Sequence, residues 1–175
     1  TAYYFDHLGV LGLASTKLAA WLGLTVTPTR LLTANDFNSG NIIITAVLLG
    51  ILLLVVGQIT LQKSFKRHFA FTYTNFGLHI FYVAALAGMF QFEGIYLLWF
   101  AALALASYLF YQKAVREKSF YIMVVSAIYS YIALSYVVIQ LLSQLNHFDM
   151  GSIYLGFIYF IVSGVLFIVF LMRSN

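Results

Sequence analysis

Apolar residues run along this chain in long, nearly unbroken blocks, separated by short polar stretches. A helix needs about 20 apolar residues to cross roughly 30 Å of hydrocarbon, because each residue adds 1.5 Å. Five blocks are long enough, and each predicts a transmembrane helix: 41–62, 70–92, 94–112, 119–142 and 152–172.

A sixth span is predicted over 2–24, where the apolar pattern is interrupted. Lys17 lies inside this segment and Asp6–His7 near its start. A charged group in hydrocarbon costs several kcal/mol unless it pairs or reaches the interface. Lys17 is about seven residues from the segment's end, within reach of the interface for a long side chain. An interfacial or re-entrant helix is the alternative for this segment.

Short connections predict that consecutive helices are antiparallel neighbours. The tightest is Glu93–Gly94, where Gly94 suits the left-handed backbone that often follows a helix. The predicted fold is therefore all-α: an integral membrane antiparallel helical bundle of five strong spans plus one N-terminal span. We expect a single transmembrane domain over 1–175.

Composition supports a membrane location. Of the 175 residues, 63% are hydrophobic and 8% charged, against roughly 25% charged in average soluble domains. The mean hydropathy is +0.95. So few charges cannot cover a soluble surface, which excludes soluble, disordered and collagen-like classes.

The positions of the charges predict the orientation. If each of the five strong blocks crosses the membrane once, seven of the nine basic residues lie on one side. The positive-inside rule makes that side cytoplasmic. We expect the loops 63–69 and 113–118 and the C-terminus to be cytoplasmic. A net charge of +4 placed in this way indicates topology rather than nucleic-acid binding.

A polar stripe on the predicted helix 70–92 is the first candidate site. Asn75, His79 and Tyr82 recur at spacings of four and three, so they share one face. Polar side chains in hydrocarbon turn toward protein or a water-filled cavity. The stripe is predicted to line a substrate or proton path, with His79 titrating. Alternatively, these residues only tie helices together by hydrogen bonds.

A second stripe lies on the predicted helix 119–142. Ser126, Tyr129, Ser130 and Tyr136 fall on one broad face. Facing the first stripe, they would close a polar pocket around His79. Close helix packing explains small and hydroxylated residues equally well.

Catalytic and cofactor chemistry has little support in the sequence. The chain has no cysteine, which excludes thiolate metal sites and cysteine nucleophiles. His68 and His79 would lie about 16 Å apart on one helix, too far to ligate one haem. No Gly-x-Ser-x-Gly elbow or phosphate-binding motif occurs. We predict no catalytic residue, cofactor or metal ligand, and a role other than catalysis is favoured.

Six stretches, spread over most of the chain, carry a resemblance: AYYFDHLGV from Ala2, AAWLGLTVTP from Ala19, NDFN from Asn35, HFAFTYTNFG from His68, KSFY from Lys118 and IYSYIALSY from Ile128. With these stretches the chain resembles a family of bacterial proteins that are predicted to be multi-pass membrane proteins and have no known function. This resemblance implies a multi-pass inner-membrane protein and no reaction.

Two functions follow from these patterns. The first is a non-enzymatic scaffold or accessory subunit that packs against other membrane helices, because packing residues abound and no catalytic set occurs. Its partners would be membrane lipids and other membrane subunits. The second is a permease for a small solute or ion that uses the polar stripe around His79.

Overall fold

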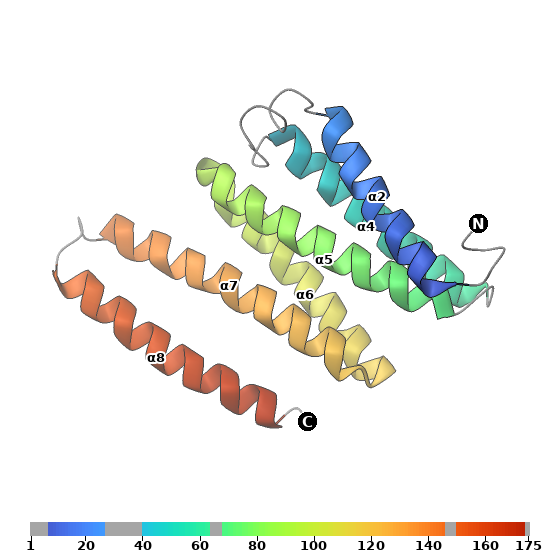
Figure 1. Ribbon diagram of the computed structural model, residues 1–175. Helices are drawn as coiled ribbons and strands as arrows, with labels where there is room; N and C mark the ends of the chain where they lie inside the picture. Colours follow the sequence, from blue (N-terminus) through green and yellow to red (C-terminus); the bar gives the residue numbers. More distant parts are fainter. Residues whose placement is uncertain (1–6, 27–39, 64–67, 146–149, 174–175) are drawn as a thin grey trace. The chain divides into compact units, whose positions relative to one another are not determined.

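The computed structural model describes residues 7–26, 40–63, 68–145 and 150–173. In these ranges the chain is all helical and contains no strand, as the apolar blocks predict. Figure 1 shows the helices, whose bounds are α2 (Leu8–Val26), α4 (Gly40–Gln62), α5 (His68–Gln91), the short 3₁₀ turn η1 (Glu93–Ile95), α6 (Tyr96–Glu117), α7 (Phe120–Leu145) and α8 (Met150–Arg173).

Four helical segments are long and apolar enough to cross a membrane: α4, α5, η1 with α6, and α7. Helices α2 and α8 contribute shorter apolar stretches, Leu8–Leu22 and Tyr154–Phe170, among the residues searched. The prediction of a membrane protein is therefore supported by four segments. The full count of five strong spans plus an N-terminal one remains a prediction.

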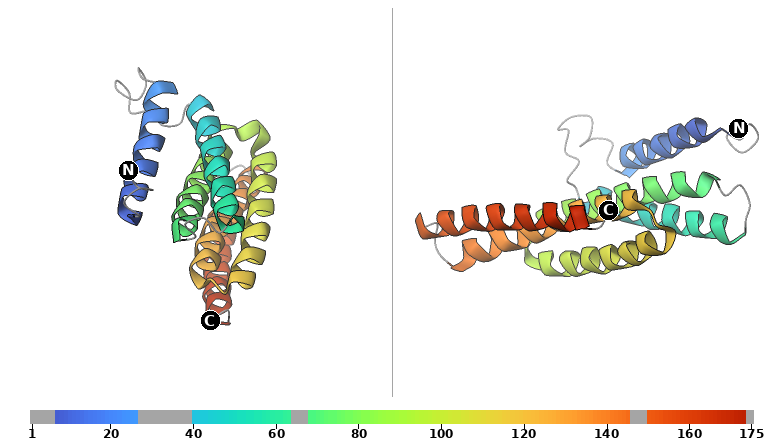
Figure 2. Two further views of the ribbon diagram at one scale, coloured as in Figure 1. Left: turned by 90° about the vertical axis from the view of Figure 1, so that its right-hand side faces the viewer. Right: turned by 90° about the horizontal axis from the view of Figure 1, so that it is seen from below.

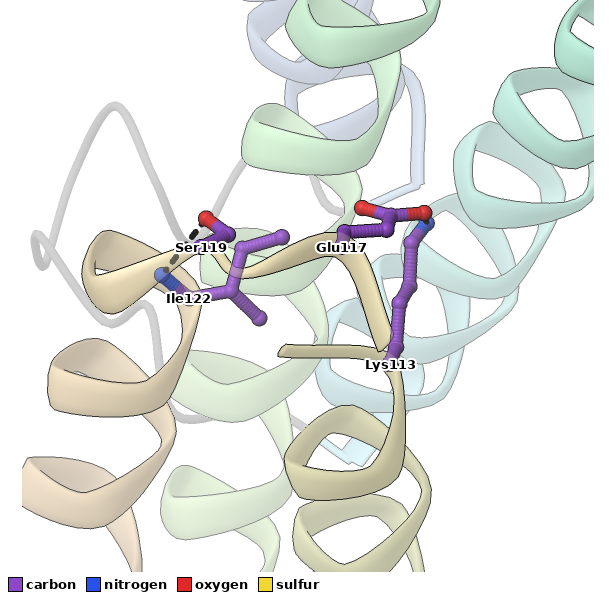
Figure 3. Close-up of polar contacts among 4 residues, drawn as sticks. All are labelled: Lys113, Glu117, Ser119 and Ile122. Atoms are coloured by element: carbon purple, nitrogen blue, oxygen red, sulfur yellow. Dashed lines mark hydrogen bonds and ion pairs between the residues drawn. The ribbon is translucent and has the colours of Figure 1, made fainter. Parts of the chain in front are cut away.

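The predicted loop 113–118 is wrong over most of its length, because α6 continues through Glu117. Lys113 and Glu117 are one helical turn apart, with Nζ and Oε1 separated by 3.9 Å (Figure 3). Such i,i+4 pairs, together with good helix-forming residues, support a helix through a charged run. The predicted loop 63–69 is also shorter, since α5 begins at His68; residues 64–67 lie outside the described ranges.

The turn after α6 consists of Lys118 and Ser119. Lys118 has a left-handed backbone with φ of 52°. Its N–H donates to the Val115 carbonyl, and the Ser119 N–H donates to the Ala114 carbonyl. These two bonds form a Schellman motif, which ends the helix. The Ser119 hydroxyl then accepts from the Ile122 N–H at 3.4 Å and caps the start of α7 (Figure 3).

The left-handed conformation predicted for Gly94 is wrong. No described glycine has a positive φ, and Gly94 lies inside η1. The Ile95 N–H donates to the Phe92 carbonyl at 3.0 Å, so a right-handed 3₁₀ turn connects α5 to α6.

The chain divides into two compact units, one ending at Trp99 and the other beginning at Phe100. In the first unit α4 and α5 pack along each other, and α2 contacts both. Glycines permit the close approach of α4 and α5. A Cβ on Gly50 would lie 2.8 Å from the Phe81 backbone nitrogen, and one on Gly77 would lie 3.0 Å from the Leu54 nitrogen.

The second unit contains α7, α8 and α6 from Phe100 onward. Helices α7 and α8 contact each other and run in opposite directions, as Figures 1 and 2 show. Their contact is sparse, and most apolar side chains of α8 are exposed, including Phe157, Ile161 and Leu166. Exposed apolar surface of this extent suits a hydrocarbon environment or another protein.

Candidate functional site

The predicted stripe on α5 lies in the first unit and is buried unevenly. Tyr82 has 0% of its surface exposed, whereas Asn75 and His79 are half-buried. All three take part in interactions with other groups. The stripe therefore contains one fully enclosed phenol and two side chains at the edge of the packed helices.

His79 lines a cavity of about 350 Å³ between α4 and α5. The remaining lining is aliphatic and consists of Ile42, Ile43, Ala46, Ile80, Val83, Ala84 and Ala87. His79 is thus the one polar side chain in this lining. The cavity presents an imidazole to an otherwise apolar space.

The predicted stripe on α7 lies in the second unit. The Ser130 hydroxyl is 2.7 Å from the Ser107 hydroxyl of α6 and 2.7 Å from the Ser126 carbonyl oxygen. A hydroxyl has one proton. If Ser130 donates to the carbonyl, Ser107 must therefore donate to Ser130. This chain of hydrogen bonds links α6 to α7.

Two other residues of that stripe, Ser126 and Tyr136, make hydrogen bonds within α7. Ser126 is buried and donates to the Met123 carbonyl at 3.0 Å. The Tyr136 hydroxyl accepts from Gln140 Nε2 at 2.8 Å, within α7. Tyr129 is half-buried. Ser130 is thus hydrogen-bonded to the backbone of Ser126, whereas Tyr136 is hydrogen-bonded to Gln140.

A second cavity, of about 360 Å³, lies among α6, α7 and α8. Its volume falls within the range of about 300–1,000 Å³ common for small-molecule sites. The lining combines serine hydroxyls with large apolar side chains: Ser107, Tyr111, Met123, Ser126, Ala127, Ser130, Tyr131, Leu134, Phe167 and Phe170.

Sequence reasoning missed the residues that join α7 to α8. The hydroxyls of Tyr131 and Ser163 are 3.1 Å apart, and those of Ser135 and Tyr159 are 3.4 Å apart. The Tyr131 ring also stacks on Phe167, with ring centres 5.2 Å apart. In each of the two pairs, a tyrosine hydroxyl of one helix lies within hydrogen-bond distance of a serine hydroxyl of the other.

One signal in the sequence could have revealed this contact. Tyr131 and Ser135 are four residues apart on α7, and Tyr159 and Ser163 are four apart on α8. Side chains at this spacing share a face. Antiparallel pairing of two such faces brings each tyrosine against a serine, as observed.

The two predicted stripes belong to different units, so the joint pocket around His79 remains a prediction. The cavity of the first unit presents an imidazole among apolar walls, and that of the second unit presents serine and tyrosine hydroxyls among apolar walls. Among the described residues, no group of three or more histidine, aspartate or glutamate side chains is placed to hold a metal ion. These arrangements suit binding and helix association.

Comparison of the chain with models of protein families, with curated proteins and with solved structures finds no match.

Proposed function

We propose that this protein is a non-enzymatic scaffold or accessory subunit of a bacterial inner membrane, whose helices pack against other membrane helices. One observation carries the proposal: glycines of α4 and α5 lie against neighbouring residues, whereas Gly156 and Gly164 of α8 have no close neighbour among the described residues. Small residues in membrane helices permit close helix contact.

The glycines inside α4 and α5 are used for contact within the first unit. Besides Gly50 and Gly77, a Cβ on Gly57 would lie 3.0 Å from the Thr74 hydroxyl oxygen. A Cβ on Gly88 would lie 2.8 Å from the Trp99 ring. In this chain, glycines within packed helices mark places where a neighbour comes close.

Helix α8 has glycines without such neighbours. A Cβ on Gly156 or Gly164 would meet nothing within 4 Å among the described residues. Helix α8 instead contacts α7 through long tyrosine side chains. Its glycines thus leave room for a helix of another protein.

Substitution of both glycines by leucine tests this role. We expect the G156L/G164L variant to lose a stoichiometric membrane partner that co-purifies with the wild type in mild detergent. Its thermal unfolding midpoint should not fall, because both positions face open space and leucine favours helix more than glycine does. The matched control is V162L/V165L, which adds bulk at exposed positions of the same helix. Native mass spectrometry of wild type without any partner would contradict the proposal.

A permease is the second candidate function, and the cavity at His79 favours it. An ionisable side chain facing an apolar cavity suits a path for protons or a small solute. The His79→Ala substitution should then abolish uptake of the solute into proteoliposomes without lowering thermal stability. As a scaffold residue, His79 would affect stability alone.

The proposed topology has six spans, including α2 and α8, with the basic loops and the C-terminus in the cytoplasm. Seven of the nine basic residues on one side support this orientation. The resemblance to bacterial multi-pass membrane proteins supports the inner-membrane location.

A further inference from the structure

The cavity of the second unit extends from the middle of α7 toward one end of the helices. Tyr111 lines it six residues before the end of α6 at Glu117, and Met123 lines it three residues after the start of α7 at Phe120. Phe170 lines it three residues before the end of α8 at Arg173. Each is therefore within about two helical turns of that end.

The same end carries unpaired positive charge. Arg116 and Lys118 flank the turn between α6 and α7 and are exposed. Arg173 is exposed at the end of α8. Among the described residues none of these three makes an ion pair, whereas Lys113 is near Glu117.

The pairing of α7 with α8 brings Arg173 to this end. Tyr131 lies opposite Ser163, and Ser135 lies opposite Tyr159. Because antiparallel residues advance in opposite directions, this register puts Arg173 beside the first turn of α7. That turn directly follows Lys118.

Lys118 occupies a position that usually favours glycine. Its φ of 52° is left-handed, a conformation that costs roughly 1–2 kcal/mol for a residue with a side chain. Glycine would relieve this cost. The lysine at this position adds a cation to the turn between Tyr111 and Met123, two residues that line the cavity.

We propose that the second unit binds one anionic phospholipid. An acyl chain lies in the cavity among α6, α7 and α8, and Arg116, Lys118 and Arg173 bind the headgroup. Apolar walls next to three exposed cations match the two parts of such a lipid. A soluble anion would make no contact with the apolar walls, and a zwitterionic lipid would not neutralise the excess positive charge.

Native mass spectrometry of the full chain tests the headgroup. Wild type should retain phosphatidylglycerol in preference to phosphatidylcholine with the same acyl chains. Each basic residue near an anionic headgroup contributes a factor of about five in affinity. The R116Q/R173Q variant should therefore lose most of this preference. The control K17Q/K63Q removes the same charge from exposed positions in the first unit. This variant should keep the preference for phosphatidylglycerol.

A second pair of variants tests the acyl chain. Ala127 lines the cavity, so Ala127→Phe should reduce retention of both lipids several-fold. Ala104→Phe adds the same ring at an exposed position of α6 and should not. If A127F does not fold, binding of sn-glycerol 3-phosphate to wild type provides the same test, because it has no acyl chain and should bind far more weakly than phosphatidylglycerol.

Several results would overturn the proposal. Equal retention of the two lipids by wild type would show that charge does not select the ligand. Equal losses in R116Q/R173Q and K17Q/K63Q would show general attraction between protein and lipid. Equal retention by A127F and A104F, or tight binding of glycerol phosphate alone, would remove the role of the cavity.

Discussion

Gly50 illustrates how a single residue determines the distance between two helices. An added Cβ would lie 2.8–2.9 Å from three atoms of Phe81, two of which belong to the backbone. A side chain can turn away from such a clash, but a helix backbone has to shift as a unit. An added methyl group at this position would therefore force α4 and α5 apart.

The Gly50→Ala substitution should lower the free energy of unfolding by about 1–3 kcal/mol, the usual cost of overpacking a close contact. The thermal unfolding midpoint of the purified protein in detergent is the measurement. Gly164→Ala is the control, because its Cβ would meet no atom within 4 Å and alanine favours helix. A stability loss of equal size in both variants would contradict the assignment of Gly50 to a close contact.

Individual site residues were only partly predictable from the sequence. The spacing of Asn75, His79 and Tyr82 puts them on one face, but spacing does not distinguish full burial, as at Tyr82, from half-burial, as at His79. That difference depends on which helix covers each position. Partners such as Ser107 for Ser130 lie on other helices, and periodicity within one helix gives no information about them.

The Lys118–Ser119 turn shows how two helices are joined by their caps. Lys118→Gly should stabilise the protein by about 1 kcal/mol, because glycine adopts the left-handed conformation without steric cost. The thermal unfolding midpoint should rise. Ala114→Gly, within the helical part of α6, should instead destabilise by a similar amount. No change in K118G would show that the turn carries little strain.

Hydrogen bonds between α7 and α8 should be energetically coupled in matched pairs. In a double-mutant cycle, Tyr131→Phe and Ser163→Ala should show a coupling of about 0.6 kcal/mol, typical of interhelical hydrogen bonds in membranes. The mismatched cycle of Tyr131→Phe with Ser143→Ala is the control, because Ser143 bonds to the Gln140 carbonyl of its own helix. Equal couplings in both cycles would contradict the observed register.

At the level of elements, hydrophobic length predicts helices well and charge predicts their ends poorly. The predicted 41–62 and 119–142 differ from α4 and α7 by three residues or fewer at each end. The end of α6 was missed because Lys113, Arg116 and Glu117 look like a loop when only their polarity is considered. Their helix propensity and i,i+4 spacing determine the outcome.

For the whole molecule, the absence of cysteine makes the proposed topology measurable, since each introduced cysteine is unique. In intact cells, Gly94→Cys should react with a membrane-impermeant maleimide, and Lys118→Cys should react only after the cells are broken. Both positions are exposed, so accessibility to solvent is matched. Labelling of K118C in intact cells would reverse the proposed orientation.

The corner around Trp99 gives the protein an optical property. Its indole stacks on Phe92 at 6.0 Å between ring centres, and its buried Nε1 has no hydrogen-bond partner among the described residues. The other tryptophan, Trp21, is exposed. Emission from Trp99 should therefore occur at the blue edge of the tryptophan range and resist aqueous quenchers. In a Trp21→Phe variant all tryptophan emission comes from Trp99. A red shift of this emission would then report the separation of Trp99 from Phe92, at the turn between α5 and α6.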